Sequence, residues 1–299
     1  MHQRLTLSTI FLLSIVPLMW ASNAVLGRML RDMVPPMTLN FIRWLLAFMV
    51  LLPLAHRVLR RDSLMWPHWR RFALLGLVSV GAYNSLQYLA LHTSTPMNVT
   101  LVGSSIPVWT LALGWLLHGE KISRRQTLGA VLSIGGVLMV LSRGDAAVLL
   151  QMRLVPGDLY VLLATAAWAY YSWMLAKPTE PPSIRQDWAA FLMAQIAFGL
   201  VWSGLFAAGE WALTPAHIVW SWPVVVAMIY IALGPALLAY RFWGAGIGRA
   251  GPAMASFFSN LTPLFAAVMS SAFLGETPRP YHALAFALIV GGIVVSSRR

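Results

Sequence analysis

The chain consists of long, continuously apolar runs, separated by short segments that hold the charged residues, Pro or Gly. Each run has about the 20 residues that a helix needs to cross a hydrocarbon layer of about 30 Å. The segments between the runs are too short for a soluble domain, and only 10% of the 299 residues are charged. Long continuous runs also argue against a β-barrel, whose strands are short and alternate. The sequence therefore predicts an all-α integral membrane protein with ten transmembrane helices, near residues 6–26, 37–54, 72–91, 97–117, 126–142, 158–176, 188–208, 223–243, 253–274 and 281–297.

Basic residues outnumber acidic ones, with 21 Lys and Arg against 9 Asp and Glu, and they stand in short clusters between the apolar runs. This placement favours the lipid bilayer over nucleic acid as the partner of the positive charge. If the N-terminus is cytoplasmic, 15 of the 21 fall in inside loops and tails and 5 fall outside, in line with the positive-inside bias. We therefore expect both termini in the cytoplasm. The first run has no small-residue cleavage site and is expected to remain as a span.

The second half of the chain repeats features of the first. A shift of 156 positions superposes prolines, glycines and a rare glutamate without a gap over 48 residues: Pro96 on Pro252, Pro107 on Pro263, Gly119-Glu120 on Gly275-Glu276, Gly135-Gly136 on Gly291-Gly292 and Arg143 on Arg299. We predict two repeats, 1–143 and 144–299, with five helices each. Because five is odd, the second repeat enters the membrane from the opposite side. Inverted repeats around a central cavity permit alternating access.

Neutral polar and aromatic side chains gather on one face of the third span. Their spacing makes them neighbours on a helix surface: Tyr83, Asn84, Gln87 and Tyr88. Amides that face lipid would lack hydrogen-bond partners, so this stripe is expected to face the interior. It either lines a cavity or ties helices together. A comparable pair in the first span of each half favours the lining role: Trp20 with Asn23, and Trp168 with Tyr171.

Two prolines, Pro107 and Pro263, lie about eleven residues into the fourth and ninth spans. A proline inside a helix frees a carbonyl and bends the helix, so both are predicted to act as hinges. Small polar residues that precede the prolines complete the expected substrate site: Asn98 and Ser104 in the first half, Ser256 and Asn260 in the second. The alternative is that the hydroxyl groups bond only to their own helix.

Arg43 lies inside the second span, near its outer end. Its side chain either snorkels outward or supplies positive potential to an outer vestibule that attracts a carboxylate. His92, at the outer end of the third span, is assigned to the same vestibule as an interfacial group.

The ionisable residues restrict the chemistry. All nine acidic residues and all seven His fall at span ends or in loops, which argues against a carboxylate proton relay and against a buried metal site. The chain has no Cys and no nucleotide-binding loop, so neither a cofactor, a metal nor an ATPase domain is expected. We predict a secondary carrier of neutral or zwitterionic small molecules. The alternatives are a carrier of nucleotide sugars, other phosphorylated metabolites or drugs, a multi-pass membrane enzyme, and a channel or receptor-like scaffold.

Several short motifs, taken together with the spans and the repeat, resemble a known family. They are Trp20-x-x-Asn23 and Arg28, Phe41-Ile42-Arg43, Pro107, Gly119-Glu120 and Gly135-Gly136. The whole chain closely resembles the EamA-type carriers of the drug/metabolite transporter superfamily, and most of all the YddG-type amino-acid exporters. One departure is Gln195, which stands where the seventh span would match Arg43. The resemblance implies a monomeric exporter of amino acids, including aromatic and apolar ones, in the bacterial inner membrane.

Overall fold

The computed structural model describes residues 5–94, 96–151, 153, 155–274 and 280–297, and this part of the chain is helical with no β-strand. The Gly275-Glu276 pair lies outside it. The helices are α1 (Leu7–Leu30), α2 (Pro36–Ala55), η1 (His56–Leu59), α3 (Trp69–Gly76), η2 (Leu77–Tyr83), α4 (Asn84–Thr93), α5 (Pro96–Gly103), α6 (Ile106–His118), α7 (Arg124–Leu141), α8 (Ala146–Leu150), α9 (Pro156–Ala176), α10 (Pro182–Arg185), α11 (Trp188–Leu213), α12 (Trp222–Ile231), η3 (Ala232–Leu238), α13 (Ala239–Ala250), α14 (Pro252–Phe258), η4 (Ser259–Leu261), α15 (Thr262–Leu274) and α16 (Pro280–Ser297).

Nine helical segments of the described residues are long and apolar enough to cross a membrane. Five of them are composite: α2 runs on into η1, and α5 leads into α6. The other three each join three helices: α3, η2 and α4; α12, η3 and α13; and α14, η4 and α15. The remaining predicted span corresponds to α7, which has 18 residues. Its first turn contains Arg124 and Arg125, whose charges lower the mean hydropathy of the helix. The fold is thus a multi-pass membrane architecture, to which α7 adds a tenth long helix.

The helix bounds of the two halves correspond closely. Adding 156 to the bounds of α5 and α6, 96 and 118, gives 252 and 274, which are the bounds of α14 and α15. The same shift carries α7, 124–141, onto α16, 280–297. A seven-residue π-helical segment also recurs in the third and eighth spans, as η2 and η3. These matches agree with a duplicated chain, and the inverted relation of the halves remains a prediction.

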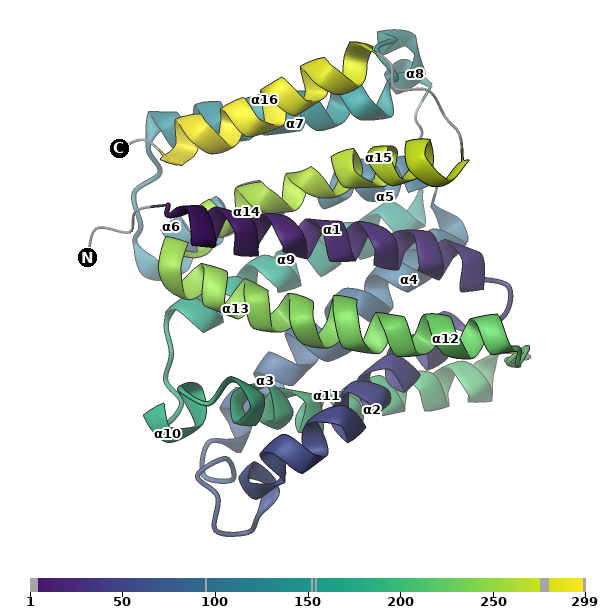
Figure 1. The fold of residues 1–299 in the computed structure, drawn as a ribbon, viewed down its shortest axis with the longest axis vertical. Helices are drawn as coiled ribbons and strands as arrows, with labels where there is room; N and C mark the ends of the chain where they lie inside the picture. The colour runs from purple at the N-terminus through teal and green to yellow at the C-terminus, as the bar shows by residue number, and fades with distance from the viewer. Residues whose placement is uncertain (1–4, 95, 152, 154, 275–279, 298–299) are drawn as a thin grey trace.

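The long helices run side by side between two faces of the molecule (Figure 1). The pair α7 and α16 forms one edge, and the pair α2 and α11 forms the opposite one. Both pairs join equivalent helices of the two halves. The start of α1, the end of α16 and the short helix α10 lie toward one face, which we call the terminal face.

The helix breaks differ from the prediction, because Pro107 and Pro263 do not lie inside continuous bent helices. α5 ends at Gly103, and Pro107 is the second residue of α6. Pro263 is likewise the second residue of α15, directly after η4. In a first helical turn the missing N–H of proline costs nothing. Each proline therefore starts the second segment of a discontinuous span.

Candidate functional site

A cavity of about 170 Å³ lies between the two halves of the molecule, and we call it the first cavity. Eight of the twelve predicted substrate-site residues line it: Trp20, Asn23, Tyr83, Asn84, Gln87, Tyr88, Ser104 and Asn260. The lining is completed by Ala24, Val99, Thr100, Gly103, Ile106, Ser259, Thr262 and Pro263. The polar stripe of the third span thus meets the broken fourth and ninth spans at one cavity. Every polar group in this described lining is neutral.

Arg43 lies behind the wall of the first cavity. The residue is 1% exposed, which argues against the alternative that its side chain snorkels outward, and its role in a vestibule stays a prediction. One guanidinium nitrogen, Nη1, donates to Asn84 Oδ1 at 3.1 Å and to the Tyr88 hydroxyl at 2.9 Å. The Tyr88 hydroxyl donates in turn to Asn23 Oδ1 at 3.0 Å. The cation is therefore held by two residues of the cavity wall, and Tyr88 extends the network to a third, Asn23.

A second set of hydrogen bonds ties the same wall to the other half of the chain. Asn84 Nδ2 donates to the main-chain oxygen of Ser79 at 3.2 Å and lies 3.1 Å from the Tyr240 hydroxyl. That hydroxyl donates to the same Ser79 oxygen at 2.9 Å. Asn84 and Tyr240 are 156 positions apart, so they occupy equivalent places in the two repeats. The predicted repeat axis consequently passes close to this contact.

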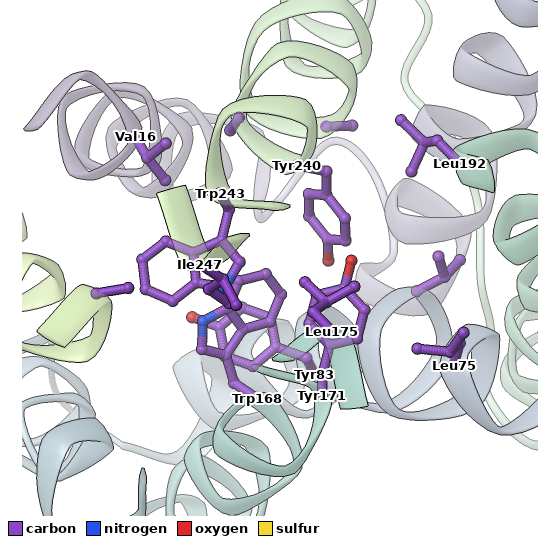
Figure 2. Close-up of a cluster of buried hydrophobic side chains, with 14 of the residues drawn as sticks. Val16, Leu75, Tyr83, Trp168, Tyr171, Leu175, Leu192, Tyr240, Trp243 and Ile247 are labelled. Atoms are coloured by element: carbon purple, nitrogen blue, oxygen red, sulfur yellow. The ribbon is translucent and has the colours of Figure 1, made fainter. Parts of the chain in front are cut away.

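Aromatic rings close the cavity on its inner side. Trp168 is 0% exposed and contacts five rings, at centroid distances of 4.5 to 5.6 Å: Trp20, Tyr83, Tyr171, Tyr240 and Trp243. Figure 2 shows five of these six side chains converging from η2, α9 and α13. We call the six rings the aromatic cluster. The prediction placed Trp168 and Tyr171 at the substrate site beside Trp20, whereas the structure places both behind the lining of the first cavity.

Two other predicted residues, Ser256 and Pro107, do not line the first cavity. Ser256 is fully buried, and its hydroxyl donates to the main-chain oxygen of Ala253 at 2.7 Å. This hydroxyl therefore bonds to its own helix, the alternative considered for these polar residues. Pro107 is buried in α6 away from the lining, whereas Pro263 lines the first cavity. The side chains of His92 and Asn98 lie outside the described part of the structure.

A second cavity, of about 310 Å³, is lined in part by Arg185 of α10, the short helix that lies toward the terminal face (Figure 1). Residues of α9, α10, α11 and α13 line it: Tyr171, Leu175, Arg185, Trp188, Phe191, Leu192, Gln195, Tyr240, Arg241, Gly244 and Ala245. Two members of the aromatic cluster, Tyr171 and Tyr240, also line this second cavity. Two other members, Trp20 and Tyr83, line the first cavity. The cluster thus separates the two cavities. Sequence reasoning missed this site, although the repeat shift relates several of its residues to those of the first cavity.

A buried ion network fixes the loop beside the second cavity. The Glu180 side chain is 0% exposed and pairs with Arg71 Nε at 3.1 Å and with Arg185 Nη1 at 3.5 Å. Arg185 also donates to the main-chain oxygen of Leu175 at 2.8 Å and lies over the ring of Phe191 at 4.4 Å. Burial lowers the pKa of the Arg185 guanidinium, and the carboxylate of Glu180 opposes that shift. Arg185 is therefore a structural cation, already paired within the chain.

Comparison with known proteins gives a family and a fold. The sequence model of the EamA-like transporter family matches residues 7–142 and again 155–298. The "Probable amino-acid metabolite efflux pump" of Salmonella typhimurium is 26% identical over 96% of this chain and 93% of its own. The "Aromatic amino acid exporter YddG" of Ancylobacter novellus is 23% identical over 78% and 76%. A solved crystal structure with 21% identity superposes with a TM-score of 0.73, covering 97% of this chain and 96% of the other.

Proposed function

The chain belongs to the EamA-like transporter family, and we propose that it exports small neutral or zwitterionic metabolites by alternating access. Amino acids, including aromatic and apolar ones, are the proposed cargo. The protein is a multi-pass membrane transporter, which agrees with a role other than that of an enzyme.

The composition of the first cavity carries this proposal. Its described lining combines aromatic rings with neutral amides and hydroxyls, and contains neither a carboxylate nor a cation. An apolar or aromatic side chain finds a large contact area on Trp20, and the ring faces attract an ammonium group. The amides of Asn23 and Gln87 offer both donors and acceptors to a zwitterion. The names of the two relatives, a probable amino-acid metabolite efflux pump and an aromatic amino-acid exporter, support the same class of cargo.

Phosphorylated cargo is the runner-up and fits the cavity less well. Recognition of phosphate requires Lys or Arg at the site, and the nearby Arg43 already donates to Asn84 and Tyr88. A cationic drug would need a counter-charge, which the described lining does not supply. A neutral or zwitterionic substrate requires no such charge.

The breaks in the fourth and ninth spans are the proposed hinges of the transport cycle. Ser104 and Asn260 lie beside these breaks and line the first cavity. Pro107 and Pro263 limit how far each first segment can continue into the second, so Ala in their place should favour a continuous helix in one half only. The chain has no Cys, so Ser104→Cys provides a single reporter. Its labelling by an impermeant thiol reagent should change in opposite directions in Pro107→Ala and Pro263→Ala. Equal changes would contradict the hinge role.

The proposed orientation has the terminal face in the cytoplasm of a bacterium, with the protein in the inner membrane as a monomer. The excess of basic residues in the loops of that face supports it. The first cavity then lies toward the outside and the second toward the cytoplasm.

Uptake into everted membrane vesicles tests the proposal, because their exposed face is the cytoplasmic one and uptake therefore measures export. Vesicles that contain the protein should take up labelled phenylalanine saturably, and unlabelled apolar amino acids should compete. Counterflow in proteoliposomes separates a carrier from an enzyme and from a channel, since only a carrier exchanges labelled for unlabelled substrate without net flux. Failure of phenylalanine and other amino acids to exchange, with a nucleotide sugar exchanging instead, would favour the runner-up.

A further inference from the structure

The second cavity is the counterpart of the first in the other half of the chain. The shift of 156 relates Asn84 and Tyr88 of the first lining to Tyr240 and Gly244 of the second. A shift of 148, which relates the first spans of the halves, carries Asn23 onto Tyr171. The two cavities therefore occupy equivalent places on either side of the aromatic cluster. Because Gly244 stands where the first lining has a tyrosine, the second cavity has more free space.

The charge of the second cavity differs from that of the first. Two guanidinium groups line it and no carboxylate does, within the described residues. Arg185 is already paired with the buried carboxylate of Glu180, which it shares with Arg71. Arg241 is exposed and lies over the ring of Trp188 at 4.2 Å, and none of the ion pairs in the described part of the chain includes it. Its charge is available to an anion that enters the cavity.

Gln195 supplies a second, independent indication of a ligand. Its side chain lines the cavity and is 1% exposed. The amide nitrogen Nε2 donates to the main-chain oxygen of Phe191 at 3.3 Å, but the carbonyl oxygen Oε1 has no hydrogen-bond partner in the structure. A buried acceptor without a donor is costly. An ammonium group is a donor that could satisfy it.

From these contacts we infer that the second cavity is a binding site for α-amino acids on the terminal face. Arg241 binds the carboxylate, Gln195 Oε1 accepts from the ammonium group, and the rings of Trp188, Phe191 and Tyr171 contact an apolar side chain. The inference rests on the proposed function and adds to it the site at which the substrate is first bound. Transport then requires the aromatic cluster to open, so that the substrate passes from the charged cavity to the neutral one.

The test separates the two charged ends of the substrate. Everted vesicles are assayed with phenylalanine, with phenylalaninamide, which lacks the carboxylate, and with 3-phenylpropionate as a competitor, which lacks the ammonium group. Arg241→Gln should raise the KM for phenylalanine about fivefold, the effect of one exposed ion pair, and leave that for the amide unchanged. Gln195→Leu should weaken binding of phenylalanine and its amide but leave competition by 3-phenylpropionate unchanged. Arg241→Lys should recover part of the loss.

Arg70→Gln is the matched control, because Arg70 is also exposed and lies over a tryptophan ring, that of Trp69 at 5.6 Å, yet lines neither cavity. It should not alter the preference for phenylalanine over the amide. An unchanged preference in Arg241→Gln, in vesicles that do transport phenylalanine, would overturn the inference and leave the proposed function intact. Absence of saturable uptake of any amino acid by the native protein would contradict both.

Discussion

Asn84 and Gln87 lie about one helical turn apart in the wall of the first cavity. Replacement of Asn84 by Leu should mainly lower stability, whereas replacement of Gln87 by Leu should mainly lower transport. Asn84 takes part in three hydrogen bonds, with Arg43, Ser79 and Tyr240. Gln87 is half-buried at the lining, and its amide interacts with the Tyr83 hydroxyl. Asn84→Leu therefore removes a network within the protein, whereas Gln87→Leu removes a group that faces the first cavity.

The expected magnitudes follow from these contacts. An interhelical hydrogen bond in a membrane protein contributes about 0.6 kcal/mol on average, and one to a charged group contributes about 1.5–3 kcal/mol. Asn84→Leu should thus lower the free energy of unfolding by about 2–4 kcal/mol, against about 0.6 kcal/mol for Gln87→Leu. If the substrate loses one hydrogen bond and leaves a polar group unsatisfied, Gln87→Leu should reduce transport at low substrate concentration about five- to thirtyfold.

Titration with sodium dodecyl sulfate, followed by circular dichroism, gives the unfolding free energies of the two variants and of the native protein. Counterflow of labelled phenylalanine, normalised to folded protein, gives the transport rates. Native stability of Asn84→Leu would show that the network does not hold the wall together. Native transport by Gln87→Leu would show that the first cavity is not on the substrate path.

Two further predictions concern packing and selectivity. Trp20→Ala should alter the ranking of amino-acid substrates in a competition assay, because Trp20 lines the first cavity. Trp168→Ala should instead lower the free energy of unfolding by about 3–5 kcal/mol, and with it the yield of folded protein, because Trp168 is fully buried among other rings. Equal changes of ranking would contradict this division. Gly136→Val should destabilise the packing of α7 against α16 by about 1–3 kcal/mol, since a Cβ atom at position 136 would lie 2.6 Å from Ile289 Cγ1. Gly135→Val should be tolerated, because a Cβ atom at position 135 would meet no atom within 4 Å. The melting temperatures of the two glycine variants test this difference.

The positions of the helices and most of the first cavity could be predicted from the sequence, because they depend on local patterns. Apolar length determines where a helix can span a membrane, and the spacing of Asn84, Gln87 and Tyr88 puts them on one face whatever surrounds them. The match of Pro107 with Pro263 likewise identified the two broken spans. Their geometry was predicted wrongly, since a proline in the first helical turn and a proline inside a bent helix have the same sequence signature.

The surroundings of single side chains could not be predicted, because they depend on other spans. Arg43 is buried since Asn84 and Tyr88, on a different helix, accept its hydrogen bonds. Trp168 matches Trp20 in the repeat, and Trp243 contacts both rings, but only Trp20 reaches the first cavity. The π-helical segments η2 and η3 also shift the faces of the helices that follow them, which a uniform period of 3.6 residues does not reveal.

The difference between the two cavities bears on how transport can be directed. Equivalent positions of the predicted repeats carry Asn84 and Tyr88 in the lining of the first cavity and Tyr240 and Gly244 in that of the second, and Arg241 adds charge to the second cavity only. In an uncoupled carrier, such asymmetry changes the substrate concentration at which each face saturates. The carrier still cannot accumulate substrate against a gradient, because a ligand shifts a conformational equilibrium only by its differential affinity for the two states. Net export then follows the substrate gradient. A stronger site on the terminal face, which we propose to be cytoplasmic, would let the carrier begin to export before the internal concentration becomes high, a useful property for the proposed export of metabolites.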